Sequence, residues 1–167
     1  ITLSYEGAGS VEVSVTQKKM VLGENHEHIF YYNSSKTGVN LTDGNSGSYF
    51  TATGTADLGG DYKISEWSIN GYTSTKGVKL NSTGSVTFKT SATLTSTVQF
   101  FFIRRKSGDS TAKIQLVPEE GDAVVLDTPY DSIADSGVIE LEKNMSYTIK
   151  QKEKEQAVLL VIVNETE

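Results

Sequence analysis

Two histidines, His26 and His28, are the residues of this chain best suited to metal chemistry. They stand two positions apart, so on a β-strand both imidazoles leave the same face, where they could begin a metal site. A full ligand set would need carboxylates from elsewhere, because the chain has no third histidine and no cysteine. We favour the alternative, a structural role at the mouth of a strand, and predict no metal, no cofactor and no catalytic residue.

Hydroxyl and carboxyl groups are plentiful but show no catalytic spacing. A hydrolytic triad would need a serine in a G-x-S-x-G elbow, which the sequence lacks. Acid pairs such as Glu119 with Glu120 fit the solvated strand faces of an acidic protein. The loops around Asp43, Asp57 and Asp61 offer oxygen ligands for a structural Ca²⁺, although their spacing matches no calcium motif.

The only tryptophan, Trp67, lies in the phrase ISEWSI (64–69). An exposed aromatic ring on a β-sheet commonly stacks on a sugar ring, so one interpretation is a ligand platform. Alternation places Trp67 and Ile69 on one strand face and Glu66 and Ser68 on the other. We therefore predict that Trp67 points into the core.

The dominant hydrophobic pattern in the segments that must position these residues has a period of two. Apolar residues alternate with polar ones in five segments. Continuous apolar runs at 98–103 and 157–163 indicate strands that are buried on both sides or lie at the centre of a sheet. Turn-forming clusters separate these segments, and none shows helical periodicity. The sequence thus predicts an all-β antiparallel sandwich of the jelly-roll type. The alternating segments are 11–16, 85–90, 112–117, 138–142 and 146–151.

The length of 167 residues suits one domain. Residues 24–167 are expected to form the sandwich, and residues 1–23 an N-terminal β-hairpin. That hairpin is either an edge pair of the sandwich or the tail of a preceding module. The chain begins at Ile1 without a signal sequence and reads as a piece of a larger protein. Absence of cysteine excludes disulfides, thiol nucleophiles and Cys-ligated zinc.

The net charge of −6 conceals an asymmetry along the chain. A chain this acidic is a poor partner for nucleic acid or for an anionic membrane, since both require a basic footprint. Residues 60–113, however, carry eight positive and three negative side chains, which leaves the remainder at −11. A local site for a polyanion therefore remains open beside the plainer interpretation, a solvated sheet face.

Four phrases in order resemble one family: HEHIF (26–30), SYFTATG (48–54), KGVKLNSTGSVTFKT (76–90) and SYTIK (146–150). Together they are similar to carbohydrate-binding modules of family 77 and to the related non-catalytic C-terminal domain of many pectate lyases, bacterial and plant-type. The most specific part is KLNSTGSVTF (79–88), and the similarity extends from about residue 26 to residue 163. The resemblance implies a β-sandwich without catalytic activity that binds pectin, chiefly homogalacturonan of low esterification.

Members of that family present lysines to uronate carboxylates. By position, Lys79 corresponds to the lysine of the Leu-Lys-x-x-Ser phrase and Lys150 to that of the closing strand. Lys63 takes the place of an earlier lysine, and Lys76 is its competitor. The sequence departs from the family pattern in three places. Val78 stands where leucine is usual, and residues 144–145 stand where a glycine usually precedes the closing tyrosine. A further lysine, Lys152, lies beside Lys150.

The alternation of the segments agrees with this resemblance. In SVTFKT and SYTIKQK the lysines Lys89, Lys150 and Lys152 leave the sheet on its polar face. The apolar residues Phe88, Tyr147 and Ile149 pack inward or at the edge of the sheet. Point charges on neighbouring strands suit a polymer with a carboxylate on every sugar, whereas a neutral glucan calls for aromatic platforms. For each lysine, the plain alternative is a solubilising surface charge.

From the resemblance we expect a secreted, extracellular and monomeric module, covalently linked to a pectin-degrading enzyme that it holds against the plant cell wall. The alternative is a structural or adhesive sandwich that serves as a spacer in a large extracellular protein. A small lyase is disfavoured because a lyase of acidic pectins works in a long groove, and this chain is short for one. Glycans at Asn81 and Asn144, two of five sequons, would crowd Lys79 and Lys150, so we expect a bacterial origin.

Overall fold

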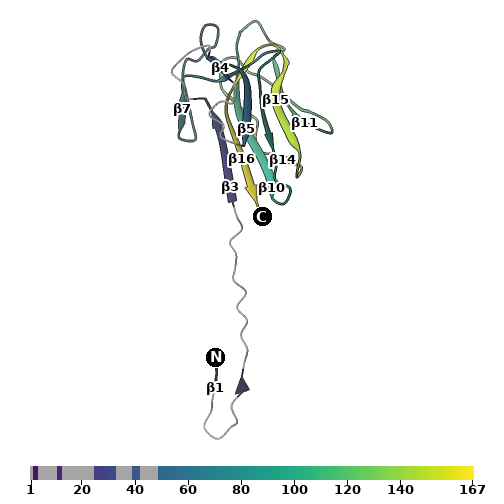
Figure 1. The fold of residues 1–167 in the computed structure, drawn as a ribbon. Helices are drawn as coiled ribbons and strands as arrows, with labels where there is room; N and C mark the ends of the chain where they lie inside the picture. The colour runs from purple at the N-terminus through teal and green to yellow at the C-terminus, as the bar shows by residue number, and fades with distance from the viewer. Residues whose placement is uncertain (1, 4–10, 13–24, 33–38, 42–48) are drawn as a thin grey trace.

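The computed structural model of the chain describes residues 2–3, 11–12, 25–32, 39–41 and 49–167. Within these residues every strand pairing is antiparallel and there is no helix, so none that could cross a membrane. The strands are β1 (Thr2–Leu3), β2 (Val11–Glu12), β3 (Asn25–Tyr31), β4 (Val39–Leu41), β5 (Phe50–Ala56), β6 (Trp67–Ile69), β7 (Tyr72–Ser74), β8 (Val78–Leu80), β9 (Ser85–Lys89), β10 (Thr95–Arg104), β11 (Lys113–Pro118), β12 (Val124–Asp127), β13 (Ala134–Asp135), β14 (Ile139–Leu141), β15 (Ser146–Glu153) and β16 (Gln156–Thr166). The predicted all-β antiparallel sandwich is confirmed (Figure 1).

Two layers make the sandwich, and β5 belongs to both. The first layer runs β12-β11-β15-β9-β5. The second is built on the last strand, β16, which pairs with β10 along one side and with β3 and β8 along the other. Because β5 pairs with β9 at its start and with β8 at its end, the sheet curls from one layer into the other. The edge strands β13 and β14 complete the second layer by pairing with β10.

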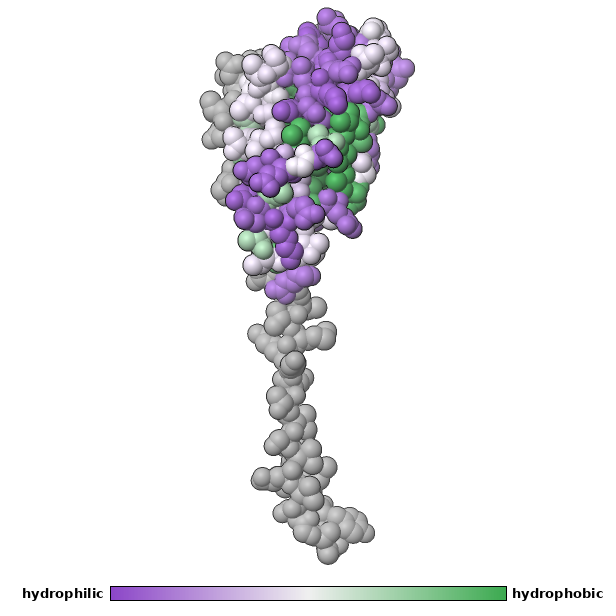
Figure 2. Space-filling model, turned by 90° about the vertical axis from the view of Figure 1, so that its right-hand side faces the viewer, coloured by the Kyte–Doolittle hydropathy of each residue, from purple (hydrophilic) through white to green (hydrophobic). Residues whose placement is uncertain are grey.

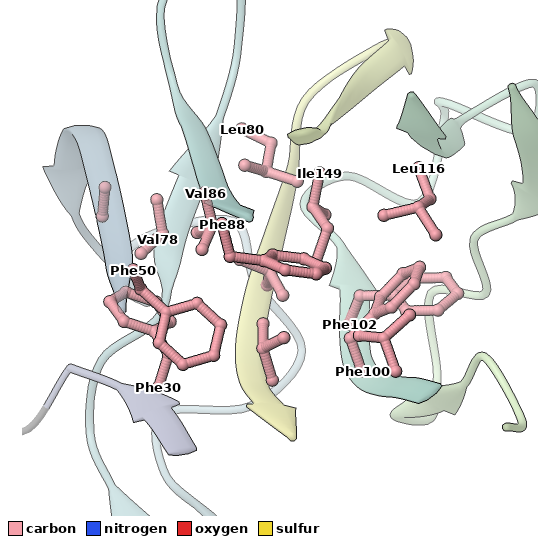
Figure 3. Close-up of a cluster of buried hydrophobic side chains, with 14 of the residues drawn as sticks. Phe30, Phe50, Val78, Leu80, Val86, Phe88, Phe100, Phe102, Leu116 and Ile149 are labelled. Carbon is pink, nitrogen blue, oxygen red and sulfur yellow. The ribbon is translucent and has the colours of Figure 1, made fainter. Parts of the chain in front are cut away.

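Apolar side chains from both layers meet in one core (Figure 3). Alternation places Val86 and Phe88 of β9 and Tyr147 and Ile149 of β15 inside it, as predicted. Removing each large side chain from water stabilises the fold by roughly 1.5–3 kcal/mol. The opposite faces of these same strands are left for polar residues, and these form the surface described below.

A second buried cluster lies on the outer face of β10 and β16. Their continuous apolar runs bury both faces, as predicted, because the segment at 57–77 packs over that side. Trp67 closes this cluster at 4% exposure, and its indole Nε1 donates to the carbonyl oxygen of Lys76 at 2.7 Å. The inward orientation expected for Trp67 is thus confirmed. With this face covered, the outer face of the first layer is the broad polar sheet surface among the described residues.

At the N-terminus, β1 and β2 pair with each other and with no other strand that the structure describes. Thr2 lies opposite Glu12 and Leu3 opposite Val11. The rest of the predicted hairpin at 1–23, including residues 13–16, lies outside the described residues. The boundary between residues 1–23 and 24–167 stays a prediction.

Candidate functional site

A polar groove of about 530 Å³ lies on the outer face of the first layer. The strands β9, β15 and β11 form its floor, because each turns its alternate, polar residues away from the core. One wall is the turn at 81–84 between β8 and β9. The side chains on the floor are Ser85, Thr87, Gln115, Thr148 and Lys150. We call this the hydroxyl groove.

Strand register places these groups in cross-strand rows. Ser85 lies opposite Lys150, which in turn lies opposite Gln115. In the next row Thr87 and Thr148 are opposite each other, with hydroxyl oxygens 3.1 Å apart. Cross-strand pairs of this kind hold neighbouring strands together. The floor is therefore a preorganised array of hydroxyl and amide groups around one cation.

The turn that walls the groove is fixed by Asn81. Its Oδ1 accepts hydrogen bonds from the backbone amides of Thr83 and Gly84, each at 3.0 Å. Gly84 approaches the preceding strand so closely that a Cβ there would lie 1.9 Å from the carbonyl oxygen of Lys79. Only glycine fits this position without moving backbone. The turn therefore keeps the groove open next to β8.

Lys150 is the cation of the hydroxyl groove. It is exposed and makes no hydrogen bond or ion pair with the described residues. Lys89 leaves the same sheet face from β9 and is also exposed and unpaired within the described chain. Because Lys89 lies opposite Ser146, four residues before Lys150 on β15, strand geometry separates their Cα atoms by roughly 14 Å. Both ammonium groups are available for an anionic ligand.

Lys79 lies outside this groove, on β8, with β9 and β5 between its strand and β15. Its Nζ is 3.3 Å from Oε1 of Glu155, and Arg105 binds the other oxygen of that carboxylate. Burial alone would raise the pKa of Glu155, but its hydrogen bonds to Arg105 and Lys79 lower that pKa overall. Lys79 therefore begins in an ion pair that a ligand would have to replace.

Lys63 lines a second groove, of about 580 Å³, with Asp61, Lys106, Asp109 and Tyr130 among its other walls. Ion pairs connect this groove to Lys79: Arg105 lies 3.6 Å from Asp61 as well as against Glu155. Lys76 is only 5% exposed. Of the four predicted lysines, the structure thus places Lys79 in an ion-pair network that extends to the groove lined by Lys63, and it places Lys150 in the separate hydroxyl groove.

The two histidines do share one strand face, as predicted, with ring centroids 6.4 Å apart. Among the described residues, no group of three or more histidine, aspartate or glutamate side chains is arranged to hold a metal ion. His28 instead stacks on Tyr49 at 3.6 Å and lies 3.3 Å from Glu165. Of the proposed calcium ligands, Asp57 caps the amide of Gly59 at 2.7 Å, Asp61 is ion-paired, and Asp43 lies outside the described residues.

Glu165 is a buried, hydrogen-bonded carboxylate that the sequence pattern did not single out. Its Oε1 accepts from the amide of Ser91 at 2.7 Å, the hydroxyl of Tyr49 at 3.0 Å and that of Ser96 at 3.2 Å. Burial would raise the pKa of Glu165, yet these hydrogen bonds and His28 lower it overall. Burial, and after it the same carboxylate, raises the pKa of Tyr49. The one signal in the sequence is its position, two residues beyond the apolar run at 157–163.

Comparisons with known proteins give structural likeness alone. No family model and no curated protein matches the chain. A structure from work on expanded glycan recognition in the Ruminococcus flavefaciens cellulosome is 16% identical, with a TM-score of 0.46, over 84% of this chain and 93% of that one. CBM35 from Cellvibrio japonicus Abf62 is 11% identical, with a TM-score of 0.38, over 81% and 91%.

An exo-β-1,3-galactanase from Phanerochaete chrysosporium is 19% identical, with a TM-score of 0.38, over 93% of this chain but 30% of that one. Likeness at these levels concerns the arrangement of strands and does not identify a ligand.

Proposed function

We propose that this chain is a non-catalytic carbohydrate-binding module for an acidic polysaccharide, with pectin of low methyl esterification as its ligand. The observation that carries the proposal is the hydroxyl groove, in which an unpaired lysine stands among hydroxyl and amide side chains. Sugar hydroxyls match the serine, threonine and glutamine groups, which both donate and accept hydrogen bonds. The ammonium of Lys150 matches a uronate carboxylate.

The lining of this groove also disfavours a neutral glucan. None of the residues that line it is aromatic, so it offers no platform for stacking a sugar ring. Trp67, the only tryptophan, is buried beneath another face. Recognition by charge and hydrogen bonds on a fixed sheet therefore fits the geometry better than recognition by stacking.

The remaining lysines have graded roles in the proposal. Lys89 meets a second carboxylate further along the same face. Lys79 contributes by exchanging Glu155 for the ligand, and Lys63 contacts a chain long enough to reach the second groove. Since Lys76 is buried, we assign the earlier family contact to Lys63 rather than to Lys76. The module would tether a covalently linked pectin-degrading enzyme to the cell wall, outside the cell.

Affinity electrophoresis in gels containing pectins of graded esterification tests the proposal. We expect retardation that grows as esterification falls and that weakens as salt rises, because exposed ion pairs are screened. Equal retardation by esterified and unesterified pectin, or none, would overturn the ligand assignment.

A matched pair of variants tests the site. Lys150→Ala should weaken binding about 2- to 5-fold, the range for one exposed ion pair of up to about 1 kcal/mol. Lys143→Ala makes the same charge change at a lysine whose Nζ donates to the carbonyl oxygen of Thr93, away from the groove, and should bind as the parent does. If both variants lose the same affinity, net charge and not the groove governs binding.

A further inference from the structure

The segment at 114–142 is acidic throughout. It carries eight aspartate and glutamate residues and no lysine or arginine. It includes most of β11, then β12, β13 and β14, which lie at the outer edges of both layers. Negative charge is thus concentrated on one side of the sandwich, on strands other than those that carry Lys89 and Lys150.

On the same side, β12 ends the first layer with an open edge. Within the described residues β12 pairs only with β11, so the backbone groups on its other side have no strand partner. Such an edge is a template for pairing with another chain. Its sequence is Val-Val-Leu-Asp, without the lysine or proline that commonly protects an edge.

An apolar slot of about 250 Å³ opens between this edge and β14. Val124 of β12 forms one wall, Ile139 and Leu141 of β14 form the other, and Leu116 and Tyr147 lie among the remaining lining residues. A slot of this size and lining suits one inserted aliphatic or aromatic side chain. Four carboxylates also line the slot, from Glu120, Asp122, Glu140 and Glu142.

The large hydrophobic side chains that are exposed on the described surface also belong to this segment. They are Val124 at 39%, Val125 at 36% and Val138 at 68%. Figure 2, which faces the side where β11 lies in Figure 1, shows a compact hydrophobic area bordered by hydrophilic residues. Exposed apolar areas with a polar rim mark interaction sites on soluble proteins.

We propose that β12 is a docking edge for an extended, basic polypeptide segment of a protein partner. The segment adds a strand to β12 and places one apolar side chain in the slot. Its flanking lysines or arginines meet the four carboxylates. This surface is separate from the hydroxyl groove, and its existence does not depend on the ligand proposed there.

Each part of the proposal follows from a different feature. Main-chain pairing with the open edge supplies affinity and requires an extended backbone. Period two then sends alternate residues of the added strand toward the slot and toward solvent. The eight acids without a single base at 114–142 select a cationic segment over an acidic one and speed its encounter.

Two synthetic peptides test this on the full 167-residue chain. The first has nine residues that alternate lysine and valine, and the second replaces each valine by glycine at the same charge. Two-dimensional amide NMR at physiological salt should show the valine peptide shifting β12 and β14 resonances and protecting β12 amides from exchange. The glycine peptide should bind at least 5-fold more weakly, because it has no side chain for the slot.

Charge-reversal variants complete the design. Glu140→Lys with Glu142→Lys, both exposed in the structure, should weaken the valine peptide at least 5-fold. Glu66→Lys with Glu153→Lys makes the same net change at exposed positions outside the segment and should leave binding within 2-fold. Absence of β12 shifts, equal binding of both peptides, or equal loss in both variants would overturn the proposal. Concentration-dependent β12 shifts without peptide would also overturn it, by identifying a second copy of the chain as the occupant.

Discussion

Replacing Glu165 by glutamine should destabilise the sandwich at neutral pH. The carboxylate lies near the end of β16 and is bound by Ser91, Tyr49, Ser96 and His28, so it ties that end to β3 and to the chain between β9 and β10. Glutamine keeps the shape but makes neutral bonds, which are weaker than bonds to a charged acceptor by about 1 kcal/mol each. Two of these bonds are 3.0 Å or shorter, which puts the expected loss at about 2 kcal/mol.

Urea titration of parent and variant at pH 7 measures this loss directly, and thermal unfolding should show a fall in Tm of about 4–8 °C for a chain of this length. A change below about 0.5 kcal/mol would refute the assignment of Glu165 as a charged acceptor, because losses of that size are ordinary for surface substitutions. Glu165→Ala serves as the stronger control, since it also leaves the donors without an acceptor.

The pH dependence of stability gives an independent check on the same residue. The folded pKa of Glu165 lies below its unfolded value, so its contribution is present above the unfolded pKa, about 4.3 for glutamate. That contribution is lost as pH falls through the folded pKa. The parent should therefore lose more stability than Glu165→Gln between pH 5 and the acid limit, and identical pH profiles would contradict the lowered pKa.

Three further substitutions at buried or closely packed positions are expected to change the stability of the fold. Gly84→Ala must displace the carbonyl of Lys79 and should lower the free energy of unfolding by about 1–3 kcal/mol in urea titration; an unchanged midpoint would contradict the close approach. Tyr62→Phe removes a buried hydroxyl with no partner in the described chain, so stability should rise by about 1 kcal/mol, and a fall would reveal a bond to that oxygen. Trp67→Phe breaks the bond to the Lys76 carbonyl and leaves a void, so a loss of about 2–4 kcal/mol is expected by thermal unfolding, and a loss below 1 would show the site repacks freely.

Sequence pattern predicted strands of two kinds, those whose two faces differ in polarity and those that are apolar on both faces. Period two identified β9, β11 and β15, and their inward residues are buried as expected. The continuous runs identified β10 and β16 as strands covered on both sides. Alternation predicts which face of a strand is buried, because every second residue points to the same face whichever strand lies alongside.

Contacts between side chains that are distant in the sequence could not be predicted in the same way. Glu155 meets Lys79, and Glu165 meets His28, 137 residues earlier. These contacts depend on the order of strands, which hydrophobic alternation does not specify. Sequence pattern does not separate the predicted lysines from one another, whereas strand order separates the hydroxyl groove with Lys150 from the ion-pair network of Lys79 and the groove lined by Lys63.

Sequence pattern also could not predict how deeply the edge strands of the sheet are buried. The alternation at 138–142 predicted a strand with one buried face, and β14 does occupy 139–141. Its Ile139 and Leu141 are only half-buried, and Val138 is 68% exposed. Because β14 pairs with β10 alone among the described strands, no neighbour covers its far side. Alternation reports a preference for burial, and only topology determines whether burial is achieved.

In the structure, the negative charge of residues 114–142 lies on one side of the sandwich. On the outer sheet face, β12 lies beside β11 at the edge of the hydroxyl groove, and its one acid, Asp127, is exposed and 3.7 Å from Lys113. The polyanion that we propose for Lys150 would be repelled on that side by the acids at 114–142 and attracted on the other, where Lys89 extends the same face. Its chain would then run from β15 across β9 toward β5, away from the β12 edge that we propose as the docking site of a basic segment. The acids at 114–142 would thus both keep the proposed polysaccharide from that edge and select a basic partner for it.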